Sequence, residues 1–211
     1  LHSRAQQTKC REGELLRHME HHARTTAPIL GANIDALSWQ QSLDQIIAWG
    51  QRRESRYVCA CNVHSVVTAS TDAVFQEVIN GADMATPDGM PVAWSLRRLG
   101  HAKQERINGP DLTWRLLARC ADLRLPVYFY GSSDSTLTAL RARIAAAFPS
   151  LQLAGMLSPP FRALSEAEDN SIVESVNASG AALVFVGLGC PKQELWMAQH
   201  RGRIHAVMLG V

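Results

Sequence analysis

The sequence predicts an α/β protein with a Rossmann-like fold, in which helices cover both faces of a mostly parallel sheet. Two observations carry this prediction. Short apolar runs alternate along the chain with segments whose apolar residues recur at helical spacing. The chain has 211 residues, of which 46% are hydrophobic and 19% charged, as is ordinary for a soluble globular domain.

Two regions differ in composition. Residues 1–27 are polar, rich in Arg, Gln, Glu and His, and we interpret them as a flexible lead-in with a short helix at 13–22. Residues 28–211 carry the alternating pattern and form the predicted α/β domain. The chain begins with Leu1 rather than Met and stops on an apolar run, so we expect it to be a piece of a longer polypeptide.

The first half of the domain alternates strands and helices. Ser38 is a good N-cap for the first helix, and Gly100 closes the last one. The apolar run at 56–62 is typical of a strand buried on both faces. The predicted elements are a strand at 28–35, a helix at 38–53, a strand at 56–62, a helix at 65–82 ending near Gly81, a strand end and turn at 83–90 and a helix at 90–100.

The second half repeats this alternation. Pro110 suits the first turn of a helix, and acidic residues occupy the first turn of the helix that begins near 165. The predicted helices are 109–123, 134–148, 165–180 and 191–201, and the predicted strands are 126–131, 151–156, 181–187 and 205–211. Ligands of such folds lie at the carboxyl ends of the strands, so candidate site residues are sought there.

The stretch VFVGLGCPKQE ends a predicted strand in two glycines, Gly187 and Gly189. Glycines allow a ligand to approach the backbone closely. Pro191 lies where a helix begins, and the unpaired N–H groups of a helix N-terminus suit a phosphate, to which Lys192 adds a cation and Gln193 an amide. An ordinary tight loop is an equally good interpretation, because glycine loops are weak signals.

Other strand ends carry weaker signals. Gly131 in YFYGSS resembles half of a dinucleotide fingerprint, but the full pattern is missing and a plain turn explains it. Asp88 lies in a Pro-Asp-Gly turn, and an aspartate held at a strand end can act as a general base. Arg106 precedes a helix and matches phosphate oxygens, although it is equally well a surface arginine.

The stretch CACNVH raises the question of a metal site. Cys59 and Cys61 are two residues apart, which is neither zinc nor redox spacing, and no second pair accompanies them. We therefore interpret the thiols as small buried hydrophobes and expect no metal or other cofactor. Asn62, a polar residue at the strand end, becomes the candidate site residue, whereas His64 lies beyond the strand.

Bulk properties exclude several classes of function. A net charge of +2 gives no support to nucleic-acid binding, so we expect no nucleic-acid partner. The basic residues between 97 and 106 either face anionic lipid or are simple helix surface. Five scattered cysteines and the lack of a signal peptide favour a reducing cytoplasm, and no apolar run approaches the length of a membrane span.

Taken in order, these motifs resemble glycosyltransferase family 26, the WecG/TagA/CpsF proteins, over about residues 29–211. The PDG turn and the GLG-x-PKQE-x-W stretch are the most distinctive parts. The resemblance implies an inverting, metal-independent transfer of a sugar from a UDP-sugar to a polyprenyl-diphosphate-linked sugar, for capsule, exopolysaccharide, enterobacterial common antigen or teichoic-acid linkage units. It also implies a peripheral location on the inner face of the plasma membrane, and leaves homo-oligomer formation open.

By the same resemblance, the catalytic residues fall on Asp88, Asn62 and Arg106. The implied substrate-binding residues are Ala60, Gly131, Gly187, Gly189, Pro191, Lys192, Gln193 and Glu194. Relatives often have threonine where Ala60 stands, which puts donor choice in question, and they continue past the last strand into a basic appendage. The resemblance leaves glucose, N-acetylmannosamine and its uronic acid open as the transferred sugar, with an exopolysaccharide-type member as one interpretation.

Two alternatives stay open at this point. One is a Rossmann-type, nucleotide-dependent oxidoreductase, which the incomplete glycine motif disfavours. The other is a non-catalytic domain that binds a nucleotide sugar. Nicotinamide binding would distinguish the first from a transferase, and a transfer assay would distinguish the second.

Overall fold

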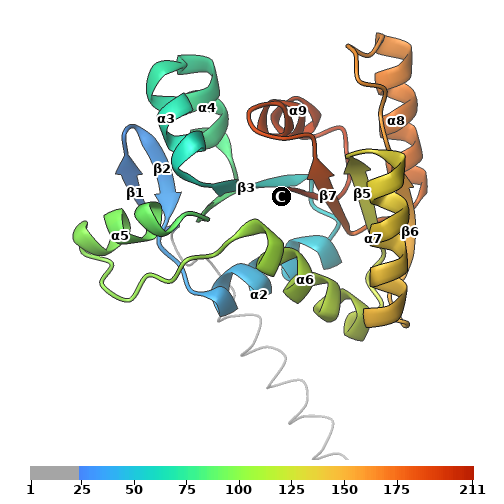
Figure 1. Ribbon diagram of the computed structural model, residues 1–211, viewed down its shortest axis with the longest axis horizontal. Coiled ribbons are helices and arrows are strands. Elements are labelled where there is room, and N and C mark those ends of the chain that lie inside the picture. The colour runs from blue at the N-terminus through green and yellow to red at the C-terminus, as the bar shows by residue number, and fades with distance from the viewer. Residues whose placement is uncertain (1–23) are drawn as a thin grey trace, which may run out of the picture.

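The computed structural model describes residues 24–211 (Figure 1). The helix predicted at 13–22 and nearly all of the lead-in lie outside the described residues. Thr26 and Ala27 already belong to the first strand, β1 (Thr26–Ile29).

The core of the fold is a six-stranded sheet in which every pair of neighbours is parallel, so the predicted fold class is confirmed. Its strand order is β4-β3-β8-β7-β5-β6. Parallel strands present all their carboxyl ends at one edge, which gathers the candidate residues there. The strands are β3 (Arg56–Cys61), β4 (Met84–Pro87), β5 (Val127–Gly131), β6 (Leu153–Leu157), β7 (Leu183–Gly187) and β8 (Val207–Gly210).

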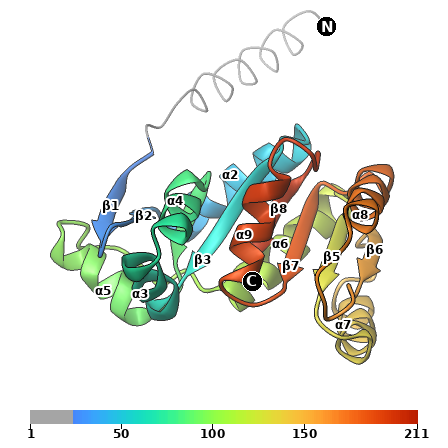
Figure 2. The same ribbon diagram turned by 90° about the horizontal axis from the view of Figure 1, so that it is seen from above.

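Helices cover both faces of this sheet (Figures 1 and 2). One face packs against α2 (Trp39–Gln51), α6 (Gly109–Leu123) and α7 (Asp134–Ala147). The other packs against α3 (Val63–Thr71), α4 (Ala73–Gly81), α5 (Met90–Arg98), α8 (Glu166–Ala178) and α9 (Lys192–His200). Alternate residues of β3 enter the two cores, as strand geometry requires: Val58 packs on one side and Cys59 on the other.

The predicted local signals of several helices are confirmed. Ser38 caps α2 in a capping box with Gln41. Pro110 stands in the first turn of α6, and Ser165 caps α8 ahead of three acidic residues. Gly100, just after α5, has a φ of 105°, a conformation that favours glycine.

Two predicted elements were each wrong in one respect. The single strand expected at 28–35 is an antiparallel hairpin of β1 and β2 (Ala32–Asp35). Its turn residues, Leu30 and Gly31, both have positive φ, as a two-residue hairpin turn demands. Leucine rarely adopts that conformation, so Leu30 at the first turn position argued against a hairpin.

The single helix expected at 65–82 is instead two helices, α3 and α4. Asp72 separates them in an extended conformation, and its side chain accepts a hydrogen bond from the Phe75 backbone N–H. This capping bond is the reason for the break, because an aspartate that caps a new helix must leave the helical conformation of the old one.

The hairpin anchors strand β4, which leads into Asp88. Asp35 is buried, and its carboxylate accepts hydrogen bonds from Arg24 at 2.7 and 2.9 Å and from the Ala85 backbone N–H at 2.6 Å. Burial raises the pKa of Asp35, while Arg24 and Ala85 act against that rise. The buried carboxylate of Asp35, paired with Arg24, therefore links the edge strand β4 to the hairpin.

Candidate active site

Asn62 and Asp88 lie side by side at the carboxyl edge of the sheet. The register pairs Cys61 of β3 with Pro87 of β4, so the residues that follow each strand end at the same level. The Asp88 backbone N–H donates to the Cys61 carbonyl at 3.0 Å. The close approach continues at Gly89, where an added Cβ would lie 3.6 Å from the Cα of Asn62.

Asp88 has the environment of a general base. Burial raises the pKa of its carboxyl group, while Arg106, the Gly109 N–H and the Asn62 amide act against that rise. Its Oδ1 atom has no hydrogen-bond partner among residues 24–211, and the Arg106 Nη2 lies 3.7 Å from it. A carboxylate with a raised pKa at a strand end suits a general base, and within the described chain its buried Oδ1 has only the Arg106 guanidinium as an ion-pair partner.

Arg106 is held close to Asp88 by more than the ion pair. Its Nε donates to the Asp88 backbone carbonyl, and the Ile107 N–H donates to the Pro87 carbonyl at 2.9 Å. The segment before α6 is thus fastened to the end of β4. The arginine lies half-exposed, with its guanidinium beside the carboxylate.

Asn62 has a structural task as well as its place beside Asp88. It is the N-cap of α3, and its Oδ1 accepts from the Ser65 backbone N–H at 3.1 Å. Because the oxygen is committed to the cap, the NH₂ group is the part of the amide that faces other partners. Its effect on the pKa of Asp88 agrees with that orientation.

Ala60, which the resemblance implied, lies opposite Thr86, which sequence reasoning missed. They are partners in the β3–β4 register, so their side chains share a face. Thr86 is fully buried, and its Oγ1 finds no hydrogen-bond partner within the described part of the chain. The residue immediately precedes the Pro-Asp-Gly turn, which could have directed attention to it.

The glycines of β5 and β7 meet at the same edge. Gly131 pairs with Gly187, and a Cβ added to Gly131 would lie 2.5 Å from the Gly187 carbonyl oxygen. Gly131 also has a φ of 115°, so both contact and conformation require glycine. A Cβ added to Gly187 or to Gly189 would meet nothing within 4 Å, which leaves open space above this loop.

The start of α9 places its four candidate residues differently. Pro191 is the N-cap, and Lys192 is exposed. Gln193 is buried; its Oε1 accepts from the Gly189 N–H at 3.1 Å and its Nε2 donates to Glu194 Oε1 at 3.1 Å. Burial raises the pKa of Glu194, whose Oε2 has no partner among residues 24–211. Gln193 and Glu194 therefore hold the glycine loop from inside.

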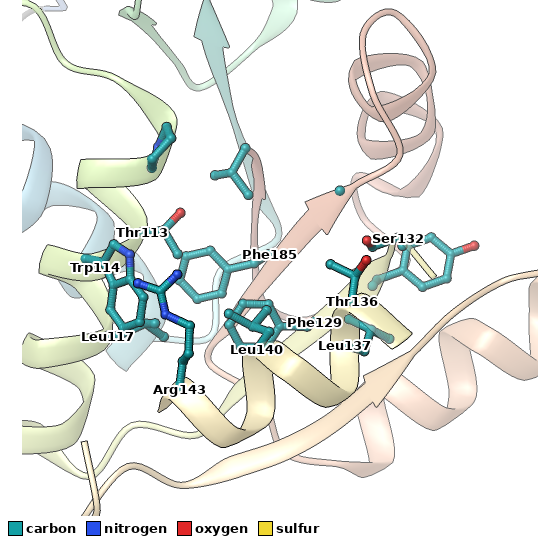
Figure 3. A pocket seen from close by; sticks show the side chains of 15 residues that line it. Thr113, Trp114, Leu117, Phe129, Ser132, Thr136, Leu137, Leu140, Arg143 and Phe185 are labelled. Atoms are coloured by element: carbon teal, nitrogen blue, oxygen red, sulfur yellow. The ribbon is translucent and has the colours of Figure 1, made fainter. Parts of the chain in front are cut away.

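An apolar pocket of about 270 Å³ opens beside the two glycines (Figure 3). It lies between α6 and α7, and Figure 3 shows the rings of Trp114, Phe129 and Phe185 together with Arg143 around it. The guanidinium of Arg143 lies 5.2 Å from the centre of a Trp114 ring. Sequence reasoning missed these side chains, because they come from separate elements and share no motif.

The cysteines at 59 and 61 are free and buried in the core, as predicted. Burial raises the pKa of both thiols well above the usual range, so they stay protonated. Over residues 24–211, no cluster of three or more His, Cys, Asp or Glu side chains is arranged to hold a metal ion.

The fold and the site define an α/β protein that carries an acid, an amide and an arginine at one end of the carboxyl edge of its sheet and an apolar pocket toward the other end. The sequence model of the glycosyl transferase WecG/TagA/CpsF family matches residues 27–211. The chain belongs to this family and is a glycosyltransferase of cell-surface polysaccharide synthesis. The match favours a transferase over the oxidoreductase considered above. Within the described residues, no helix is both long and apolar enough to cross a membrane.

Proposed function

We propose that the protein is an inverting, metal-independent hexosyltransferase that moves a sugar from a UDP-sugar to a polyprenyl-diphosphate-linked sugar. It works at the inner face of the plasma membrane. The observation that carries this proposal is Asp88, a partly buried carboxylate with a raised pKa at the carboxyl edge of a parallel sheet, whose side chain is paired with Arg106.

The proposed chemistry is a single displacement. Asp88 takes the proton from the acceptor hydroxyl, whose oxygen forms a bond to the anomeric carbon of the donor sugar. The bond from that carbon to the diphosphate oxygen breaks, and UDP leaves from the opposite face with the electron pair. The anomeric configuration is inverted, and Asp88 later releases its proton to water.

Positive groups of the protein stabilise the departing diphosphate in this mechanism. Arg106 lies beside Asp88, and its fork of N–H donors matches phosphate oxygens. Lys192 is exposed at the N-terminus of α9, where the helix dipole adds partial positive charge. These groups would supply the compensation that a metal ion gives in other nucleotide-sugar enzymes.

The pocket beside Gly131 and Gly187 suits the nucleoside half of the donor. Its aromatic lining offers faces for a planar base, and the two glycines leave room at its mouth. Asp88 follows β4 and the pocket adjoins β7, three strand spacings away, or about 14 Å. An extended nucleoside-diphosphate sugar bridges such a separation.

The test is a transfer assay with a panel of UDP-sugars and a polyprenyl-diphosphate-linked sugar acceptor. We expect one of UDP-glucose, UDP-N-acetylmannosamine or its uronic acid to react, with equal rates in EDTA. The anomeric protons of the product, observed by NMR, would show inversion. Retention, a requirement for metal, or donor binding without any transfer would each refute a part of the proposal.

A further inference from the structure

Two helices begin directly at the site and expose apolar side chains. α3 follows Asn62 and α5 follows Asp88-Gly89. The exposed side chains are Val63 (45%) and Val67 (48%) on α3, and Met90 (37%) and Trp94 (53%) on α5. Each pair is four residues apart, so its members lie on one helix face. We call these four residues the apolar rim.

The two halves of the apolar rim meet beside the catalytic edge. A Cβ added to Gly89, the residue before Met90, would lie 3.6 Å from the backbone N of Val63. Both helices lie at the β4 end of the sheet in both views (Figures 1 and 2). Four of the ten exposed large hydrophobic side chains among residues 24–211 thus border the strand ends that carry Asn62 and Asp88, and exposed apolar side chains that lie together mark a site of interaction.

Cations continue the rim. Arg98 follows Trp94 by four residues on α5, and Lys103 follows in the loop; both are exposed. Among residues 24–211, neither forms an ion pair, in contrast to the arginines at 56 and 201, which bind Asp83. Between 90 and 106 the chain carries four Arg or Lys residues and a single acid, Glu105, an excess of three positive charges.

We propose that the apolar rim and the cations beside it form the surface that docks on a bilayer of anionic phospholipid. This inference rests on the proposed function and names the face involved. A tryptophan at the interface, small apolar side chains and unpaired cations are the combination that anionic bilayers bind. A second copy of the chain would bring like charges together, so the observations favour the bilayer.

Docking in this orientation has a consequence for catalysis. The carboxyl edge with Asp88 faces the headgroup layer, which is where the diphosphate of a lipid-linked acceptor lies. The prenyl chain stays in the bilayer, and only the sugar has to reach the site. The donor pocket lies toward the other end of the same edge, away from the apolar rim.

The experiment measures vesicle binding without any substrate, so it does not depend on whether transfer occurs. The protein is sedimented with vesicles of phosphatidylcholine alone or mixed with phosphatidylglycerol. We expect binding to the mixed vesicles that weakens with salt. Arg98→Gln with Lys103→Gln should lower the partition coefficient about 20-fold to 30-fold. Trp94→Ser should lower the partition coefficient by a larger factor than this double variant does. Circular dichroism verifies that the variant is folded.

A matched control removes two exposed arginines at the other end of the molecule, Arg124→Asn and Arg141→Gln, and should leave vesicle binding unchanged. Transfer to a short-chain, water-soluble acceptor should stay at the wild-type rate in Arg98→Gln with Lys103→Gln. Equal binding to neutral vesicles, or an equal loss in the control, would overturn the proposal. A change of oligomeric state in the Trp94 variant would assign the rim to a second copy instead.

Discussion

The two ends of the carboxyl edge of the sheet differ in the chemical character of their residues. Around β3 and β4 the edge is polar and charged, with Asp88, Asn62, Arg106 and the buried hydroxyl of Thr86. Around β5 and β7 it is glycine and aromatic surface enclosing a pocket. Under the proposed function, this contrast corresponds to a division of work in which one end would hold the reacting atoms and the other would bind the planar base of the donor.

The sharpest test of this division is Asp88→Asn. If Asp88 is the base, turnover should fall by about 10²-fold to 10⁴-fold, because proton abstraction is lost. UDP binding, measured by calorimetry, should stay within about twofold of wild type, since the pocket lies at the other end. Asp122→Asn, an exposed aspartate on α6, is the control and should leave both quantities unchanged. Undiminished turnover in Asp88→Asn would show that Asp88 is not the general base.

A complementary pair of variants addresses the pocket end. In Gly131→Ala the new Cβ would lie 2.5 Å from the Gly187 carbonyl oxygen at a φ of 115°, so we expect a loss of about 1–3 kcal/mol in unfolding free energy. Gly187→Ala is matched to it, because its Cβ would meet nothing within 4 Å and stability should change little. Urea denaturation measures both.

UDP affinity then distinguishes an effect on ligand recognition from an effect on the stability of the fold. A stable Gly187→Ala protein that binds UDP more weakly would support the pocket as the nucleoside site, because only the methyl group at its mouth has changed. Unaltered UDP affinity in that variant would indicate that the nucleoside binds outside this pocket.

The pH dependence of stability sharpens the contrast in a different way. Burial raises the pKa of Asp88 above its ordinary value of 3.8. The contribution of this carboxyl group to the unfolding free energy is therefore complete below about pH 4 and is lost as pH rises through the raised pKa. Asp88→Asn should therefore be more stable than wild type at pH 7, and the difference should vanish toward pH 4. Thermal unfolding from pH 4 to 8 measures it.

Glu168 on α8 is the control of opposite sign. Arg162 and Ser165 lower the pKa of Glu168 to about 2, so its contribution is present above the ordinary pKa and is lost as pH falls. Glu168→Gln should be less stable than wild type at pH 7, with a difference that shrinks in acid. The same sign in both variants would contradict the raised pKa of Asp88.

The two ends also differ in how far sequence could predict them. Asp88, Asn62 and Arg106 stand in compact motifs after strands, and parallel strands bring such residues to one edge. The pocket arises from α6, α7, β5 and β7, whose aromatic residues look like ordinary core until the helices are placed. Spacing along one chain does not encode which helices will face each other.

The same reasoning explains the errors in the fold. The alternation of apolar segments predicted the parallel sheet, because burial on both faces leaves a strong signal. The hairpin turn at Leu30 and the helix break at Asp72 each depend on the backbone conformation of a single residue. The neighbouring sequence does not predict that conformation. Similarly, the position of the Thr86 hydroxyl opposite Ala60 follows from the strand register, which a sequence pattern does not give.

The smallest expected effect lies within the polar end, at Ala60. Threonine there would stand beside Thr86 on the same sheet face, and the two hydroxyls could hydrogen-bond. Ala60→Thr should therefore raise the unfolding free energy by about 0.2–1 kcal/mol. In a Thr86→Val background the gain should disappear, which a double-mutant cycle in urea would measure.

The kinetic consequence of Ala60→Thr decides what the pair does. If the Thr86 hydroxyl is free in order to contact the donor sugar, engaging it with a new neighbour should raise the KM for the donor while kcat stays the same. A gain in stability with unchanged donor KM would mean that the hydroxyl is only buried there. Either result bears on the polar end alone, because Ala60 and Thr86 lie on β3 and β4, away from the pocket between α6 and α7.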